Sequence, residues 1–135
     1  MFTCIENTFL KSSLNNNILS FEVIKGTPNE HEWQTSKTMI DTWYTYLEDY
    51  NIRVGLIFLL NNLIFIKPRH LSEWKEIFDS KRTKTKKHII GTAIIVENAL
   101  IRIFVNTFFS SFGSERPVKI VKNQEDSIEF IKTIE

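Results

Sequence analysis

The chain has little cysteine, glycine and proline, and no excess of charge of either sign. Its single cysteine, Cys4, cannot form an internal disulfide and excludes a cysteine-rich zinc site. The 17 basic and 16 acidic residues give a net charge of +1, so no overall field draws nucleic acid or an acidic substrate. The four glycines are scattered, which excludes a glycine-rich phosphate loop. A lone cysteine favours a reducing compartment, and we expect a cytoplasmic protein.

The sequence also lacks a secretion signal and a credible membrane span. Its first residues do not place a basic region before an apolar run. The apolar stretch 89–109 is interrupted by Glu97, Asn98, Arg102 and Asn106, whereas a span needs about 20 largely apolar residues. We therefore expect no transmembrane segment.

No catalytic pattern is present in the sequence. The three histidines, His31, His70 and His88, stand beside charged residues at predicted element edges, and we interpret each as a solvated surface side chain. None is spaced as a metal-binding pair, and no nucleophile, base and acid combine into a recognisable motif. We expect no enzymatic activity, no catalytic residue, no metal and no cofactor.

Hydrophobic periodicity predicts nine elements in one domain that spans residues 1–135. Two strands, 2–10 and 18–25, form a hairpin around the loop SSLNNN. A helix follows with Thr27, Pro28 and Glu30 as its capping box. The later elements are a buried strand at 52–60, a helix at 68–80, a strand at 89–96, a helix at 99–111, a strand at 118–121 and a helix capped by Asn123. The order β-β-α-β-α-β-α-β-α predicts an α/β fold with a mixed, mostly parallel five-stranded sheet flanked by helices.

This order resembles the SpoIIAA-like or STAS-like domains, which include anti-sigma-factor antagonists. The strand IRVGLIFLLNN matches the central strand of that family, and AIIVENALIRIFVNTFF with PVKIVKNQEDSIEFI matches its second half. The resemblance implies a regulatory binding module. The antagonists carry a phosphorylatable Ser or Thr after the central strand, but here the corresponding loop, 61–65, has no hydroxyl residue. Because Ser72 lies inside the predicted helix, we do not expect a phosphorylation switch.

The helix at 99–111 has more large apolar side chains than one core-facing stripe needs. Helical spacing predicts that one stripe faces the sheet, namely Leu100, Ile103, Phe104, Thr107, Phe108 and Ser111. The other apolar residues, with a polar rim, then form a partner or ligand surface. That predicted surface comprises Ile101, Val105, Phe109, Phe112, Arg102 and Asn106.

A basic run between two predicted elements is the other candidate. The run could contact phosphates. However, it lacks interleaved aromatic residues that would stack on bases, and the rest of the chain offsets its charge. We therefore interpret the run as a solvated connector and do not expect nucleic acid to bind. Its cations are Lys81, Arg82, Lys84, Lys86 and Lys87.

Two functional hypotheses follow from these patterns. The first is a non-enzymatic regulatory or scaffold module that forms a homodimer or docks a protein partner through the helix at 99–112. The second, by analogy with Sec14-like domains, is a carrier of a small apolar or lipid ligand.

Overall fold

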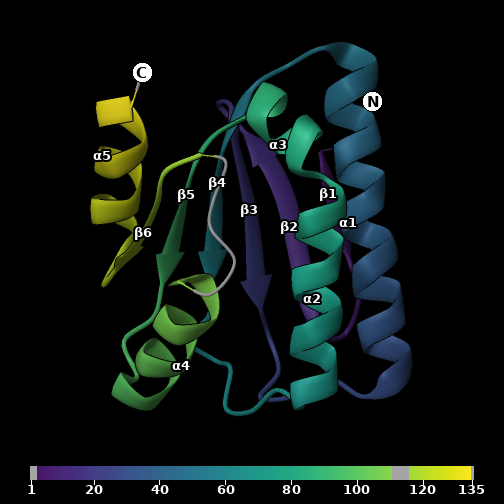
Figure 1. The fold of residues 1–135 in the computed structure, drawn as a ribbon, viewed down its shortest axis with the longest axis vertical. Coiled ribbons are helices and arrows are strands. Elements are labelled where there is room, and N and C mark those ends of the chain that lie inside the picture. Colours follow the sequence, from purple (N-terminus) through teal and green to yellow (C-terminus); the bar gives the residue numbers. More distant parts are fainter. Residues whose placement is uncertain (1–2, 111–115, 135) are drawn as a thin grey trace.

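The computed structural model describes residues 3–110 and 116–134, apart from the side chains of Phe104 and of residues 107–110. One six-stranded sheet lies between helices (Figure 1). In chain order the elements are β1 (Cys4–Glu6), β2 (Leu10–Asn15), β3 (Ile18–Val23), α1 (Glu30–Tyr50), β4 (Val54–Leu59), α2 (Pro68–Ser80), α3 (Arg82–His88), β5 (Ile89–Ile95), α4 (Ala99–Ser110), β6 (Val118–Val121) and α5 (Gln124–Ile134).

The six strands lie in the sheet in their sequence order. β1, β2 and β3 pair antiparallel, whereas β3, β4, β5 and β6 pair parallel. The central strands β4 and β5 are almost entirely buried, as expected for parallel strands covered on both faces. The prediction of a single α/β domain with a mixed, mostly parallel sheet is therefore confirmed, although the sheet has six strands and not five.

The two faces of the sheet are covered unequally. The larger apolar cluster joins the sheet to α1, α2 and α4, with Trp43, Phe21 and Phe58 near its centre. The other face packs against α5 through a smaller cluster that includes Ile57 and Ile95. In Figure 1, α1 and α2 run side by side while α5 stands apart beside β6. The part of the second face that α5 does not reach belongs to β2 and β3.

The first hairpin differs from its prediction because a polar segment forms a strand. The predicted loop residues Ser12 to Asn15 belong to β2, and the turn consists of Asn16 and Asn17 alone. Both asparagines have positive φ angles, 51° and 63°, as a two-residue type I′ turn requires. The predicted strand 2–10 is correspondingly split into β1 and the start of β2.

Two helix boundaries also differ from their predictions. The N-cap of α1 is Asn29 and not Thr27: its side chain accepts a hydrogen bond from the backbone N–H of Glu32, whose carboxylate accepts one from the N–H of Asn29. The basic run, predicted to be a connector, forms the short helix α3. Lys81 is the C-cap residue of α2 and also the N-cap residue of α3, so the basic run joins two consecutive helices.

Candidate functional site

The carboxyl ends of the parallel strands β3, β4 and β5 meet at one edge of the sheet, where the segments after them are bonded to one another. The backbone N–H groups of Ile64 and Phe65 donate to the carbonyl oxygen of Gly26, at 2.8 and 3.1 Å. The Asn61 side chain accepts a hydrogen bond from the N–H of Glu97 at 3.0 Å. The Asn62 amide donates to the carbonyl oxygen of Val23 at 3.2 Å. These bonds fix the three loops relative to one another.

Gly26 lies against the Ile64 side chain. A Cβ atom at position 26 would lie 2.8 Å from Cδ1 of Ile64, which is the far end of an exposed side chain. The hydrogen bonds to the Gly26 carbonyl oxygen hold the β4–α2 loop against the β3–α1 loop and fix the backbone of Ile64 and Phe65.

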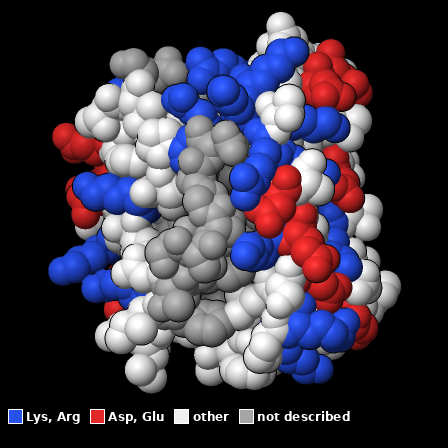
Figure 2. Space-filling view, viewed as in Figure 1, with Lys and Arg blue, Asp and Glu red and all other residues white. Residues whose placement is uncertain are grey.

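Large apolar side chains are exposed on these bonded segments. Ile64 is 77% exposed and Phe65 54%, in the β4–α2 loop. Leu100 is 77% exposed and Ile103 64%, on the first turns of α4. Ile24, which directly follows β3, is also exposed. We call these five residues the apolar edge; Figure 2 shows uncharged side chains at the corresponding lower end of the molecule, around α4 and the β4–α2 loop.

The orientation of α4 differs from the predicted one at three positions whose side chains the structure describes. Leu100 and Ile103, predicted to face the sheet, are exposed, whereas Val105, predicted to face outward, is only 6% exposed and belongs to the core. Ile101 is half-buried against the same core. The assignment of Leu100, Ile103 and Val105 was therefore wrong, whereas Ile101 is neither fully exposed nor fully buried.

Polar contacts at the start of α4 explain this orientation. The Asn98 side chain accepts hydrogen bonds from the N–H groups of Leu100 and Ile101, at 2.9 and 3.2 Å, and so caps the helix. The guanidinium of Arg102 donates to the carbonyl oxygen of Val96 at 3.0 Å. These contacts hold the side of the helix that carries Arg102 toward the end of β5.

The other four residues of the predicted surface differ in exposure and in whether the structure describes them. Asn106 is exposed, and the half-buried Arg102 is bonded to the backbone. The side chain of Phe109 and the whole of Phe112 lie outside the described residues. Their part in a binding surface stays a prediction.

An apolar pocket of about 70 Å³ lies between the sheet, α1, α2, α4 and the β4–α2 loop. The β4–α2 loop contributes Leu60, Leu63 and Ile66 to its lining, while the intervening Ile64 and Phe65 are exposed on the apolar edge. Val105 lines the same pocket from α4. The β4–α2 loop and α4 therefore contribute residues to both the pocket and the apolar edge. The other lining residues are Phe9, Leu10, Val23, Trp33, Phe58, Leu71, Trp74 and Ile94.

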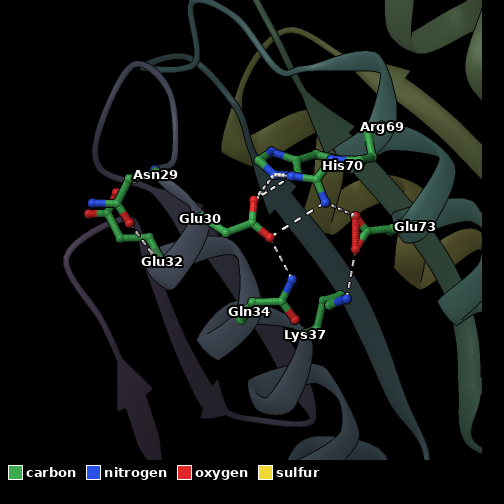
Figure 3. A network of polar contacts seen from close by, with 8 residues as sticks. All are labelled: Asn29, Glu30, Glu32, Gln34, Lys37, Arg69, His70 and Glu73. Carbon is green, nitrogen blue, oxygen red and sulfur yellow. Dashed lines mark hydrogen bonds and ion pairs between the residues drawn. The ribbon is translucent and has the colours of Figure 1, made fainter.

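A polar network links the starts of α1 and α2 (Figure 3). Glu30 accepts hydrogen bonds from Arg69 at 2.5 Å and from Gln34 at 2.9 Å, and its carboxylate lies 3.1 Å from Nε2 of His70. The Arg69 guanidinium, followed by His70 and Gln34, lowers the pKa of the Glu30 carboxyl to about 2. Glu73 extends the network through its ion pairs with Lys37 and Arg69. The network therefore fixes α2 against α1.

The interpretation of all three histidines as solvated was wrong for two of them. His70 is fully buried, and its ring stacks on Trp33 with the centroids 4.8 Å apart. His88 is also buried, with Nδ1 2.9 Å from the carbonyl oxygen of Ile52. Only His31 is exposed. The two buried rings take part in packing and hydrogen bonds between elements.

Three cations of the basic run have acidic neighbours. Lys81 forms an ion pair with Asp41, Arg82 with Asp79 at 3.1 Å, and Lys84 with Glu48 at 3.7 Å. Lys86 and Lys87 are exposed at the end of α3. Pairing reduces the charge that the run can offer to a phosphate, although a role for all five cations in phosphate contact stays a prediction.

Within residues 3–110 and 116–134, no three metal-ligating side chains gather into a cluster that could hold an ion. No helix in that part of the chain is both long and apolar enough to cross a membrane.

Comparisons with known proteins identify the fold. No protein-family model matches the chain, and no curated protein matches it. A similar solved structure is the crystal structure of an uncharacterized protein of the DUF3478 family, with a SpoIIAA-like fold, from Shewanella loihica PV-4. The two structures align with a TM-score of 0.63 over 97% of this chain and 98% of that chain, at 11% sequence identity. The chain therefore has a SpoIIAA-like fold, as its element order predicted, and the likeness concerns the fold alone.

Proposed function

We propose that this protein is a non-enzymatic binding module that docks a protein partner through the apolar edge. The observation that carries the proposal is the exposure of five large apolar side chains on two loops and the first turns of α4, in segments that are hydrogen-bonded to one another. Large apolar groups gathered on a soluble surface mark interaction sites. Because the loops are fixed, little conformational entropy would be lost when a partner binds.

The apolar pocket supports an anchored mode of docking. Binding energy at protein interfaces concentrates in a few apolar or aromatic groups that fill pockets. The pocket of about 70 Å³ suits one apolar side chain of the partner, while Phe65 and Leu100 would contact the surface around it. The exposed Asn106, one turn after Ile103, would contribute to the polar rim.

The carrier hypothesis is less well supported by the pocket. Its lining is apolar, as a lipid tail requires, but its volume is about 70 Å³. An engineered cavity of about 150 Å³ accommodates a molecule the size of benzene. A lipid would therefore require the β4–α2 loop and α4 to separate, against the hydrogen bond between Asn61 and Glu97.

Affinity purification from native cells with quantitative mass spectrometry tests the docking role. The tagged wild-type chain is compared with the edge variants Phe65→Asp and Leu100→Asp. Tyr50→Asp is the matched control, because Tyr50 is as exposed as Phe65 but lies at the C-terminal end of α1. We expect a specific partner to be lost from both edge variants and retained by the control. Equal recovery with all three variants would contradict the proposal.

Light scattering on the purified protein distinguishes a second copy from a different partner. A wild-type dimer that becomes a monomer in Leu100→Asp would identify the partner as this chain itself. A monomer for wild type and variants, together with the selective loss described above, would identify a different protein.

A further inference from the structure

An open groove of about 800 Å³ lies on the face of the sheet opposite α1, α2 and α4, between α5 and the β2–β3 hairpin. Its size falls in the range of about 300–1,000 Å³ that is usual for small-molecule sites. It is separate from the apolar edge, with which it shares no residue. Its lining comprises Ser13, Asn15, Asn16, Asn17, Ile18, Ser20, Arg53, Ile57, Ile90, Gln124, Ile128, Ile131 and Lys132.

Strand register gives the floor of the groove a polar side and an apolar side. Ser13 pairs with Ser20, and Ser20 pairs with Ile57, so one row across the sheet changes from hydroxyl to aliphatic side chains. Ile57 and Ile131 are buried where α5 packs on the sheet. Ile128 remains partly exposed on the α5 wall. One end of the groove therefore offers hydrogen-bonding groups and the other an apolar surface.

The charge of the groove is of one sign. Arg53, between α1 and β4, and Lys132, on α5, both line it and are exposed. Neither forms an ion pair with another residue in the described ranges. Among the described residues that line the groove, none is an aspartate or glutamate. Two exposed cations close to a partly exposed apolar side chain are complementary to an anion that carries a short apolar body.

A solvated sheet face accounts for only part of this arrangement. An antiparallel pair such as β2–β3 commonly leaves one polar face in water, which explains Ser13 and Ser20. It does not explain why Arg53 and Lys132 flank a groove whose α5 wall also carries the partly exposed Ile128. We infer that this groove binds a small amphiphilic anion, with a carboxylate or phosphate head held by Arg53 and Lys132 and an aliphatic body laid along the partly exposed Ile18 and Ile128.

Titration of the isotope-labelled full chain, followed by amide resonances, tests this inference. The probes are octanoate, octyl phosphate and octan-1-ol, which share a chain length and differ in the head group. We expect saturable shifts at Ser20, Ile57 and Ile128 with octanoate or octyl phosphate, and the stronger of the two identifies the head group. Octanol should bind at least about tenfold more weakly, because it lacks the charge.

Variants connect the binding to the two cations. Arg53→Gln with Lys132→Gln should raise the dissociation constant of the anionic probe about tenfold, whereas Lys122→Gln, an exposed cation outside the groove, should leave it unchanged. If the double variant does not fold, Lys132→Gln alone provides the comparison. The inference is overturned by the absence of saturable shifts at millimolar anion, by shifts confined to the apolar edge, or by equal binding of octanol.

Discussion

The orientation of α4 decides which residues form the apolar edge, and paired truncations test it. Val105→Ala removes two methyl groups from a side chain that is 6% exposed and packed in the core. At about 0.8 kcal/mol for each buried methyl or methylene group, the transfer term is about 1.6 kcal/mol, and the enlarged cavity adds to it. We expect a loss of about 2 kcal/mol in the free energy of unfolding.

Leu100→Ala is the matched control on the same helix. It removes more carbon atoms than Val105→Ala, but from a side chain that is 77% exposed. We expect a change within about 0.5 kcal/mol, because alanine is also a good helix former. Urea denaturation followed by circular dichroism measures both values. If Leu100→Ala destabilises the protein more than Val105→Ala, α4 faces the sheet with the stripe that periodicity predicted, and the apolar edge loses two of its five residues.

Two further predictions concern the core of the fold. The N–H of Asn29, followed by Thr8 and Lys25, holds the pKa of the Glu32 carboxyl at about 2, below its ordinary 4.5. Because the folded-state pKa is lowered, the ionised carboxyl contributes to stability fully above about pH 4.5, and this contribution is lost as the pH falls toward 2. Glu32→Gln should therefore flatten the dependence of the unfolding free energy on pH over that window. An unchanged slope in the variant would contradict this role. Gly55→Ala should destabilise the protein by about 1–3 kcal/mol, because the new Cβ atom would lie 2.6 Å from Cγ2 of Ile131. In the double variant with Ile131→Ala, the total loss of unfolding free energy should be smaller than the sum of the two single losses. Additive losses in thermal denaturation would show that the two side chains do not meet.

The parallel half of the fold was predictable because burial on both faces is visible in the sequence. β4 and β5 read as continuous apolar runs, and their boundaries follow those runs closely. β2 was missed because its residues read as a loop. Ser12 is fully buried there: its hydroxyl donates to the carbonyl oxygen of Ile5 and accepts from Nε1 of Trp43, both at 2.7 Å. A serine satisfied by partners distant in sequence gives no periodic signal.

The candidate surface was only partly predictable. The excess of apolar residues pointed to a helix that does carry two exposed apolar side chains, but when residues on every side are apolar, the hydrophobic period does not determine which side faces the sheet. Asn98 fixes the first turn of α4 by capping it, and Arg102 ties the helix to the backbone after β5 through the carbonyl oxygen of Val96. Ile64 and Phe65 were missed because an apolar loop reads as a buried connector, and their exposure depends on a tertiary contact with Gly26. His70 reads as solvated because its stacking partner, Trp33, is distant in sequence.

Site-specific photo-crosslinking in native cells tests the central claim most directly. A photoreactive phenylalanine analogue replaces Phe65 on the apolar edge or, as the control, Tyr50, which is similarly exposed at the far end of α1. Irradiation should yield a covalent protein adduct from position 65 and none from position 50, and mass spectrometry then identifies the adduct as a second copy or another protein. No adduct from position 65, or the same adducts from both positions, would contradict docking at the apolar edge.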